Sequence, residues 1–214
     1  MGQVYLAYDP SLGRKVALKF LQNVAPDAVA RFFAEARAQA RVTHPNIGEV
    51  YEVGEIRGTP FLAIQYIDGK TLEAAAPELT IEQKVLVMRQ VAEAIQAAHA
   101  QGLIHRDIKP SNIMVTASGR VVLLDFGLAW SHGADQLTRS GAELGTIHYM
   151  APEQFAGAAA RVDERTDVYS LGVVLRELVT LRSAFEGTTV DEVARKVREG
   201  RHTPFHASSS SAVR

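Results

Sequence analysis

The chain has 214 residues, of which 47% are hydrophobic and 22% charged, an ordinary composition for a globular protein of one or two domains. Its 23 basic and 24 acidic residues give a net charge of -1, which offers no reason to expect a nucleic-acid partner. The absence of cysteine excludes disulfides, thiolate zinc sites and a cysteine nucleophile, and no run of about 18 apolar residues predicts a membrane segment. We expect a cytoplasmic chain, and a longer, membrane-anchored parent protein stays open.

The first part of the chain has the patterns of a sheet with one helix. Residues 5–21 alternate between apolar and polar types around a turn at 9–13, which predicts a β-hairpin. Asp27 is expected to cap a helix that ends at the His-Pro-Asn sequence that follows it. Two further strands are predicted at 47–53 and 60–67. The inward side of the helix is predicted to carry Val29, Phe32, Phe33, Ala36 and Ala40.

A long amphipathic helix is predicted in the middle of the chain. Thr80 and Gln83 have the spacing of a capping box, which satisfies two backbone N–H groups at a helix start. Gly102 suits the position after the last turn, where a left-handed residue ends a helix. The apolar side of the helix is predicted to carry Ile81, Val85, Met88, Val91, Ile95 and Ala98.

A short hairpin and two more helices are predicted after this long helix. Residues 113–115 and 121–124 are apolar runs separated by an Ala-Ser-Gly turn, as expected for a hairpin. Residues 166–180 are apolar nearly all round, which is typical of a buried helix. Residues 190–198 have the pattern of a short amphipathic helix.

Polar residues gather around the predicted hairpin. The stretch HRDIKPSN at 105–112 comes directly before its first strand, and DFG at 125–127 directly follows its second. Asp107, Asn112 and Asp125 therefore lie on or beside two neighbouring strands, where their oxygen atoms can converge. Oxygen ligands of this kind suit Mg²⁺, which is usually coordinated by one or two carboxylates together with phosphate groups.

A lysine and a glutamate upstream form a second candidate pair. Lys19 ends the strand sequence VALK, and Glu35 lies one turn from Phe32 on the side of the helix that is predicted to pack inward. A buried glutamate is costly unless it is paired with a cation. We therefore expect Lys19 to be the partner of Glu35.

Four motifs together resemble the protein kinase family: VALK at 16–19, HRDIKPSN at 105–112, DFG at 125–127 and APE at 151–153. Their order and spacing, with the sequence DVYSLG at 167–172, are most similar to bacterial eukaryotic-like Ser/Thr kinases. The resemblance implies an α+β fold of two lobes, with a small antiparallel-sheet lobe containing one helix and a larger, mainly helical lobe. It also implies ATP- and Mg²⁺-dependent transfer of the γ-phosphate to Ser/Thr hydroxyls of protein substrates.

The resemblance assigns roles to individual residues. Lys19, held by Glu35, would bind the α- and β-phosphates, while Asp107 would accept or orient the substrate hydroxyl and Lys109 would contact the transferred phosphate. Asn112 and Asp125 would hold Mg²⁺. The ATP-binding residues would be Gly2, Val4, Ala17, Lys19, Gln65, Ile67 and Met114, with the adenine hydrogen-bonded to the backbone of Gln65 and Ile67.

Regulation is also implied by the resemblance. Thr138 and Ser140 lie at positions similar to the autophosphorylation pair of the family, which leaves open a self-association for phosphorylation in trans. Arg106 precedes the catalytic Asp107, and kinases with this arginine commonly need a phosphorylated loop to neutralise it. Asp167 should anchor the backbone that precedes Asp107.

The chain departs from the family pattern at several places. We divide it into a first lobe at 1–67, a partial second lobe at 68–205 and a low-complexity tail at 206–214. By comparison with the family, the first strand and most of the Gly-rich loop are expected to be missing, as are the last helices. Gln39 occupies a helix position that is usually apolar or small.

Two other functions stay open. A catalytically impaired, kinase-like module that binds nucleotide or partners is the alternative favoured by the missing segments. A small-molecule phosphotransferase of similar fold shares the Asp, Asn and Asp residues, but it usually lacks an Ala-Pro-Glu motif such as the one at 151–153.

Overall fold

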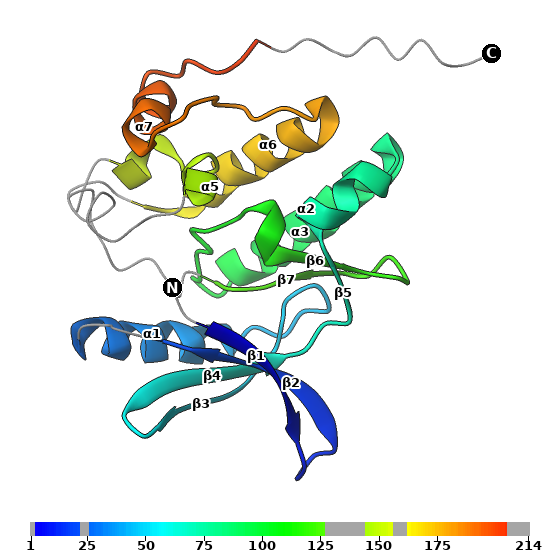
Figure 1. Ribbon diagram of the computed structural model, residues 1–214, viewed down its shortest axis with the longest axis vertical. Coiled ribbons are helices and arrows are strands. Elements are labelled where there is room, and N and C mark those ends of the chain that lie inside the picture. The colour runs from blue at the N-terminus through cyan, green and yellow to red at the C-terminus, as the bar shows by residue number, and fades with distance from the viewer. Residues whose placement is uncertain (1–2, 22–25, 127–143, 156–161, 205–214) are drawn as a thin grey trace.

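The computed structural model describes residues 3–21, 26–126, 144–155 and 162–204. A four-stranded sheet and one helix, α1, form a small lobe, and a larger, mainly helical lobe lies above it in the view of Figure 1. The two-lobed α+β prediction is confirmed. No helix among the described residues is long and apolar enough to cross a membrane.

The sheet of the small lobe is antiparallel, with the strand order β1-β2-β4-β3. Asp9 accepts hydrogen bonds from the backbone N–H groups of Ser11 and Leu12, and Gly13 follows with a φ of 62°. These contacts form the hairpin turn that the sequence predicted. The strands are β1 (Gln3–Asp9), β2 (Arg14–Phe20), β3 (Val50–Ile56) and β4 (Thr59–Gln65).

Helix α1 (Pro26–Gln39) packs on this sheet through Phe32 and Ala36, which are buried together with residues of β4. The helix begins one residue before Asp27, the predicted cap, and it ends before Ala40, which is exposed. Gln39 is buried instead, because positions 32, 36 and 39 follow the i, i+4, i+7 spacing of one helix side. The inward side of α1 thus ends on a polar residue.

The larger lobe carries a second antiparallel sheet, with the strand order β5-β6-β7. Its strands and helices, in chain order, are β5 (Gly69–Thr71), α2 (Leu72–Ala75), η1 (Ala76–Glu78), α3 (Ile81–His99), η2 (Pro110–Asn112), β6 (Ile113–Thr116), β7 (Val121–Leu123), α5 (Leu144–Ile147), η3 (Pro152–Phe155), α6 (Glu164–Thr180) and α7 (Val190–Arg198).

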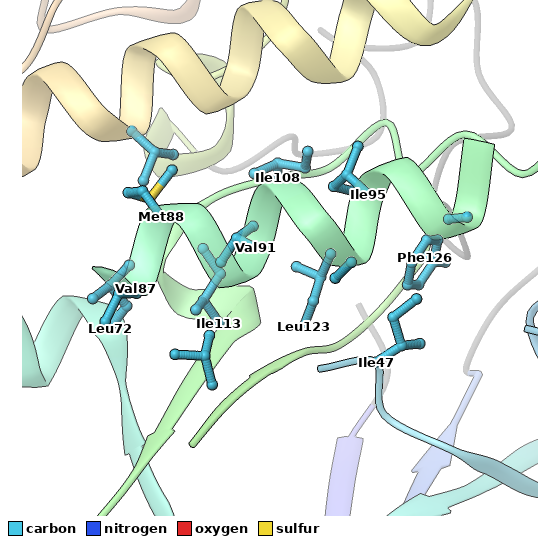
Figure 2. Packing of buried hydrophobic residues seen from close by; sticks show 14 of the residues in the cluster. Ile47, Leu72, Val87, Met88, Val91, Ile95, Ile108, Ile113, Leu123 and Phe126 are labelled. Carbon is cyan, nitrogen blue, oxygen red and sulfur yellow. The ribbon is translucent and has the colours of Figure 1, made fainter. Parts of the chain in front are cut away.

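Helix α3 lies at the centre of the largest core cluster, against β6, β7 and α6 (Figure 2). The predicted capping box of Thr80 and Gln83 is present at its start. Val91 is fully buried, whereas Ile81 and Val85, both predicted on the buried side, are about half exposed. Lys84 in the first turn is buried together with Val87 and Met88, so the buried side of α3 is turned away from Ile81 and Val85.

Helix α6 differs from the prediction of a helix buried all round. Val174 and Leu178 pack into the core, but the exposed fraction of Val168 is 61% and that of Leu175 is 38%. The first turns of α6 also contain Asp167, a fully buried carboxylate. A carboxylate is rarely buried unless hydrogen bonds satisfy it, so Asp167 must have partners nearby. These partners lie in the loop of the candidate site described below.

Candidate active site

A cavity of about 220 Å³ lies between the small-lobe sheet and the β6–β7 hairpin. All the predicted nucleotide-binding residues that the structure describes line it, and the predicted Gly2 lies outside the described residues. Sequence reasoning missed Leu6, which lies two residues after Val4 and so on the same side of β1. The lining residues are Val4, Leu6, Ala17, Lys19, Ile64, Gln65, Tyr66, Ile67, Met114, Leu124 and Asp125.

The loop beside this cavity is anchored by Asp167. Its carboxylate accepts hydrogen bonds from the backbone N–H groups of His105 and Arg106, each at 2.8 Å. The anchor holds Arg106 in a left-handed conformation, with a φ of 65°, that a non-glycine residue rarely adopts. The sequence predicted this role of Asp167 but missed His99, whose Nε2 lies 2.7 Å from the same carboxylate.

Three predicted catalytic or metal-binding residues come together in this loop. The Oδ2 atom of Asp107 lies 3.0 Å from Lys109 Nζ and 3.0 Å from Asn112 Nδ2. Lys109 also donates a hydrogen bond to Thr146 Oγ1 at 2.9 Å, which joins the loop to α5. The carboxylate of Asp107 is thus fixed in direction and lies beside a cation.

His105 is packed in the core beside this loop. It is fully buried, its ring lies 4.5 Å from that of Phe126, and its Nε2 lies 2.9 Å from the carbonyl oxygen of Leu124. Burial lowers the pKa of His105 and so favours the neutral ring. Its role is to join the loop to the segment that carries Asp125.

The predicted ion pair between Lys19 and Glu35 is wrong. Among the described residues, Lys19 Nζ pairs with Asp125 Oδ1 at 2.8 Å, and Glu35 Oε1 pairs with Arg106 Nη1 at 3.3 Å. Burial raises the pKa of Glu35 to about 7, and the charges of Arg106 and Arg31 oppose that increase. Glu35 is paired with a cation, as predicted, but that cation is Arg106 of the loop at 105–112.

The donor set near the cavity suits a Mg²⁺ ion shared with phosphates. Asn112 donates its side-chain N–H groups to Asp107, which leaves its Oδ1 as the side-chain atom with free lone pairs. Asp125 adds one carboxylate at the cavity wall. No group of three or more His, Cys, Asp or Glu residues that could hold a metal occurs in the described part of the chain. One carboxylate and one amide fit an ion whose other ligands are phosphate oxygens and water.

Two further predicted residues cannot be placed. Thr138 and Ser140, the predicted phosphorylation sites, lie outside the described residues. Thr146 of α5, by contrast, is described and contacts the site through its hydrogen bond from Lys109.

The fold and the site define a protein with the architecture of a kinase catalytic domain, and comparison with known proteins agrees. Residues 1–213 match the protein kinase domain family. The chain belongs to the protein kinase family. Among solved structures, the chain is similar to the crystal structure of Rad53 1-466 in complex with AMP-PNP, with a TM-score of 0.73 and 23% sequence identity. The match covers 94% of this chain and 51% of that chain. At this identity the similarity shows the fold alone.

Curated relatives of the chain include bacterial serine/threonine-protein kinases. It is 39% identical over 207 residues to PknA of Mycobacterium tuberculosis and 37% identical over 202 residues to PrkC of Bacillus subtilis, in each case over 92% of this chain. These alignments span 48% of PknA and 31% of PrkC. The chain therefore spans half the length of these relatives or less.

Proposed function

We propose that the chain is a protein serine/threonine kinase that transfers the γ-phosphate of ATP, with Mg²⁺, to hydroxyl groups of protein substrates. The observation that carries this proposal is the convergence of Asp107, Lys109 and Asn112 beside a cavity whose wall includes Lys19 and Asp125. Phosphoryl transfer needs mainly positioning and neutralisation of phosphate charge, and these groups supply both.

The proposed roles divide between the cavity and the loop. The apolar walls formed by Val4, Ala17 and Met114 would hold the adenine, with Ile64 behind it. Lys19 would contact the α- and β-phosphates. Gly2, outside the described residues, would belong to the loop that covers them. Asn112 and Asp125 would hold a Mg²⁺ ion, whose charge would neutralise the phosphates.

Asp107 would orient the attacking hydroxyl and take its proton, because its carboxylate is fixed by Lys109 and Asn112. The hydroxyl oxygen would bond to the γ-phosphorus while the bond between that phosphorus and the β–γ bridging oxygen breaks. Lys109 would contact the transferred phosphate from its place between Asp107 and Thr146. These hydrogen bonds would keep Lys109 beside the reacting hydroxyl.

Intact mass after incubation with Mg-ATP tests this proposal. We expect phosphate on the unmutated chain, mapping to Thr138 or Ser140, and a rate at least about 100-fold lower in Asp125→Ala and in Lys19→Met. Asp191→Asn, at an exposed position of α7, is the matched control and should behave like the unmutated chain. Turnover like that of the unmutated chain in either site variant would contradict the assigned roles.

The alternative is a nucleotide- or partner-binding module with impaired catalysis. The observation that favours it is that Lys19 pairs with Asp125 and not with Glu35. The same experiment separates the two functions. A folded, unmutated chain that acquires no phosphate, on itself or on an added protein substrate, would support the alternative.

A further inference from the structure

The two outer strands of the small-lobe sheet, β1 and β3, differ in how their edges are protected. The pairing of β3 with β4 is irregular, with a shift of register between Val50 and Glu52, and β3 carries the exposed carboxylates of Glu52 and Glu55. Bulges and charged side chains are means by which an edge strand avoids pairing with another chain. β1 has neither, because its register with β2 is unbroken and residues 3–8 carry no charge.

The edge formed by β1 is also apolar. The exposed fraction is 59% for Val4, 59% for Leu6 and 65% for Tyr8. These three side chains share one side of the strand, because side chains alternate along it. Val4 and Leu6 also line the cavity of the candidate site, so the wall of the cavity is open to solvent along β1. An edge strand moreover directs alternate backbone N–H and C=O groups away from its single neighbour, where another strand can bind them.

We propose that β1 pairs edge to edge with β1 of a second copy of this chain, antiparallel and with Leu6 opposite Leu6 of the partner subunit. In this register all seven residues of the strand are paired. Val4 lies opposite Tyr8 of the partner subunit, and an aromatic ring beside a β-branched side chain is a favourable cross-strand pair. Asp9 lies opposite the neutral Gln3 of the partner subunit, so no like charges of the two strands meet.

The side chains of β1 favour a second copy over a strand of another protein. Strand addition takes its affinity from backbone hydrogen bonds and its specificity from alternate side chains. The side chains of β1 match those of the same strand in reverse order, as a two-fold axis requires. Residues 3–8 offer no charge that would select an acidic or a basic strand. Seven residues a side is fewer than the about 20–30 of a stable interface, so we expect a dimer of micromolar affinity.

The dimer also completes the wall of the cavity, a consequence that rests on the proposed nucleotide site. Tyr8 of the partner subunit lies beside Val4, on the side of the sheet that faces the cavity, and covers part of the exposed surface of Val4. Apolar surface removed from water here stabilises the bound adenine and the dimer together. Because coupling between two binding events is reciprocal, saturating Mg-ADP should strengthen the dimer about fivefold.

The first test is sedimentation equilibrium of the unmutated chain without nucleotide, at concentrations from about 1 to about 200 μM. We expect the molar mass to rise from 23.3 kDa towards twice that value. A mass of 23.3 kDa at every concentration would overturn the proposal.

Charge substitutions at the centre of the strand test the register. Leu6→Lys and Leu6→Glu each bring like charges together and should weaken the dimer at least about tenfold. An equimolar mixture of these two variants should recover the dimer, because opposite charges then meet. Ile56→Lys, at an exposed position of the other edge strand β3, is the matched control and should leave the dimer unchanged.

A dimer that persists in Leu6→Lys, or a mixture of the two Leu6 variants that stays monomeric, would overturn the pairing. If a Leu6 variant does not fold, the more exposed Tyr8→Lys replaces it and should also weaken the dimer, since it places a charge against Val4 of the partner subunit.

Repeating the sedimentation experiment with Mg-ADP tests the link to the cavity, with titration calorimetry as a separate measure of Mg-ADP binding. Mg-ADP that binds without strengthening the dimer would overturn the completion of the cavity wall. A chain that dimerises but binds no Mg-ADP would refute the proposed nucleotide site and not the pairing of β1.

Discussion

The catalytic loop and the pair formed by α1 and β2 supply the same site through different kinds of contact. In the loop, Asp107 and its neighbours are held by hydrogen bonds to backbone groups and by the buried carboxylate of Asp167. Lys19 and Glu35 are instead held by ion pairs between partly exposed side chains of different elements. The hydrogen-bonded loop has few alternative conformations, whereas the partly exposed ion pairs can exchange partners with a small loss of free energy.

The largest effect is expected where the loop is anchored. Asp167→Ala would leave the backbone N–H groups of His105 and Arg106 buried without an acceptor, and it would release the left-handed Arg106. We expect the free energy of unfolding to fall by about 3–5 kcal/mol, measured by urea denaturation. The exposed Asp191→Ala should change it by less than about 1 kcal/mol. Equal losses in both variants would mean that Asp167 does not anchor the loop.

A smaller, pH-dependent effect is expected at Glu35. The pKa of Glu35 is raised from 4.5 to about 7, so the folded state favours the neutral acid and loses stability as the pH rises between these values. Glu35→Gln removes this loss. Its melting temperature, relative to that of the unmutated chain, should therefore be a few °C higher at pH 8 than at pH 5. A difference that is the same at both pH values would contradict the raised pKa.

The smallest effect is expected at Gln39, which joins the end of α1 to the segment before β3. Its Nε2 donates to the carbonyl oxygen of Gly48 at 3.0 Å, while its Oε1 is buried without a partner among the described residues. Gln39→Met removes both the hydrogen bond and the unsatisfied oxygen, and the two effects oppose each other. We expect a change within about 1 kcal/mol in urea denaturation. A loss above about 2 kcal/mol would show that this hydrogen bond fixes α1.

Local sequence signals determined much of the fold. The capping box of Thr80 and Gln83 set the start of α3, and α7 has the bounds that the pattern of 190–198 predicted. The apolar pattern alone misplaced the buried side at the start of α3, because Lys84 is buried there while Ile81 and Val85 are about half exposed. A periodic pattern indicates one side of a helix, but packing against other elements decides the limits of that side.

The sequence by itself predicted which residues gather at the candidate site. The spacing of the HRDIKPSN and DFG motifs around a hairpin brought Asp107, Asn112 and Asp125 to one region, since a hairpin of this length allows few other arrangements. Only the tertiary structure decided which charge pairs with which. The four charged residues lie in separate segments of the chain: Lys19, Glu35, Arg106 and Asp125. Which of them form ion pairs depends on the position of α1 relative to the loop, and no local sequence pattern encodes that position.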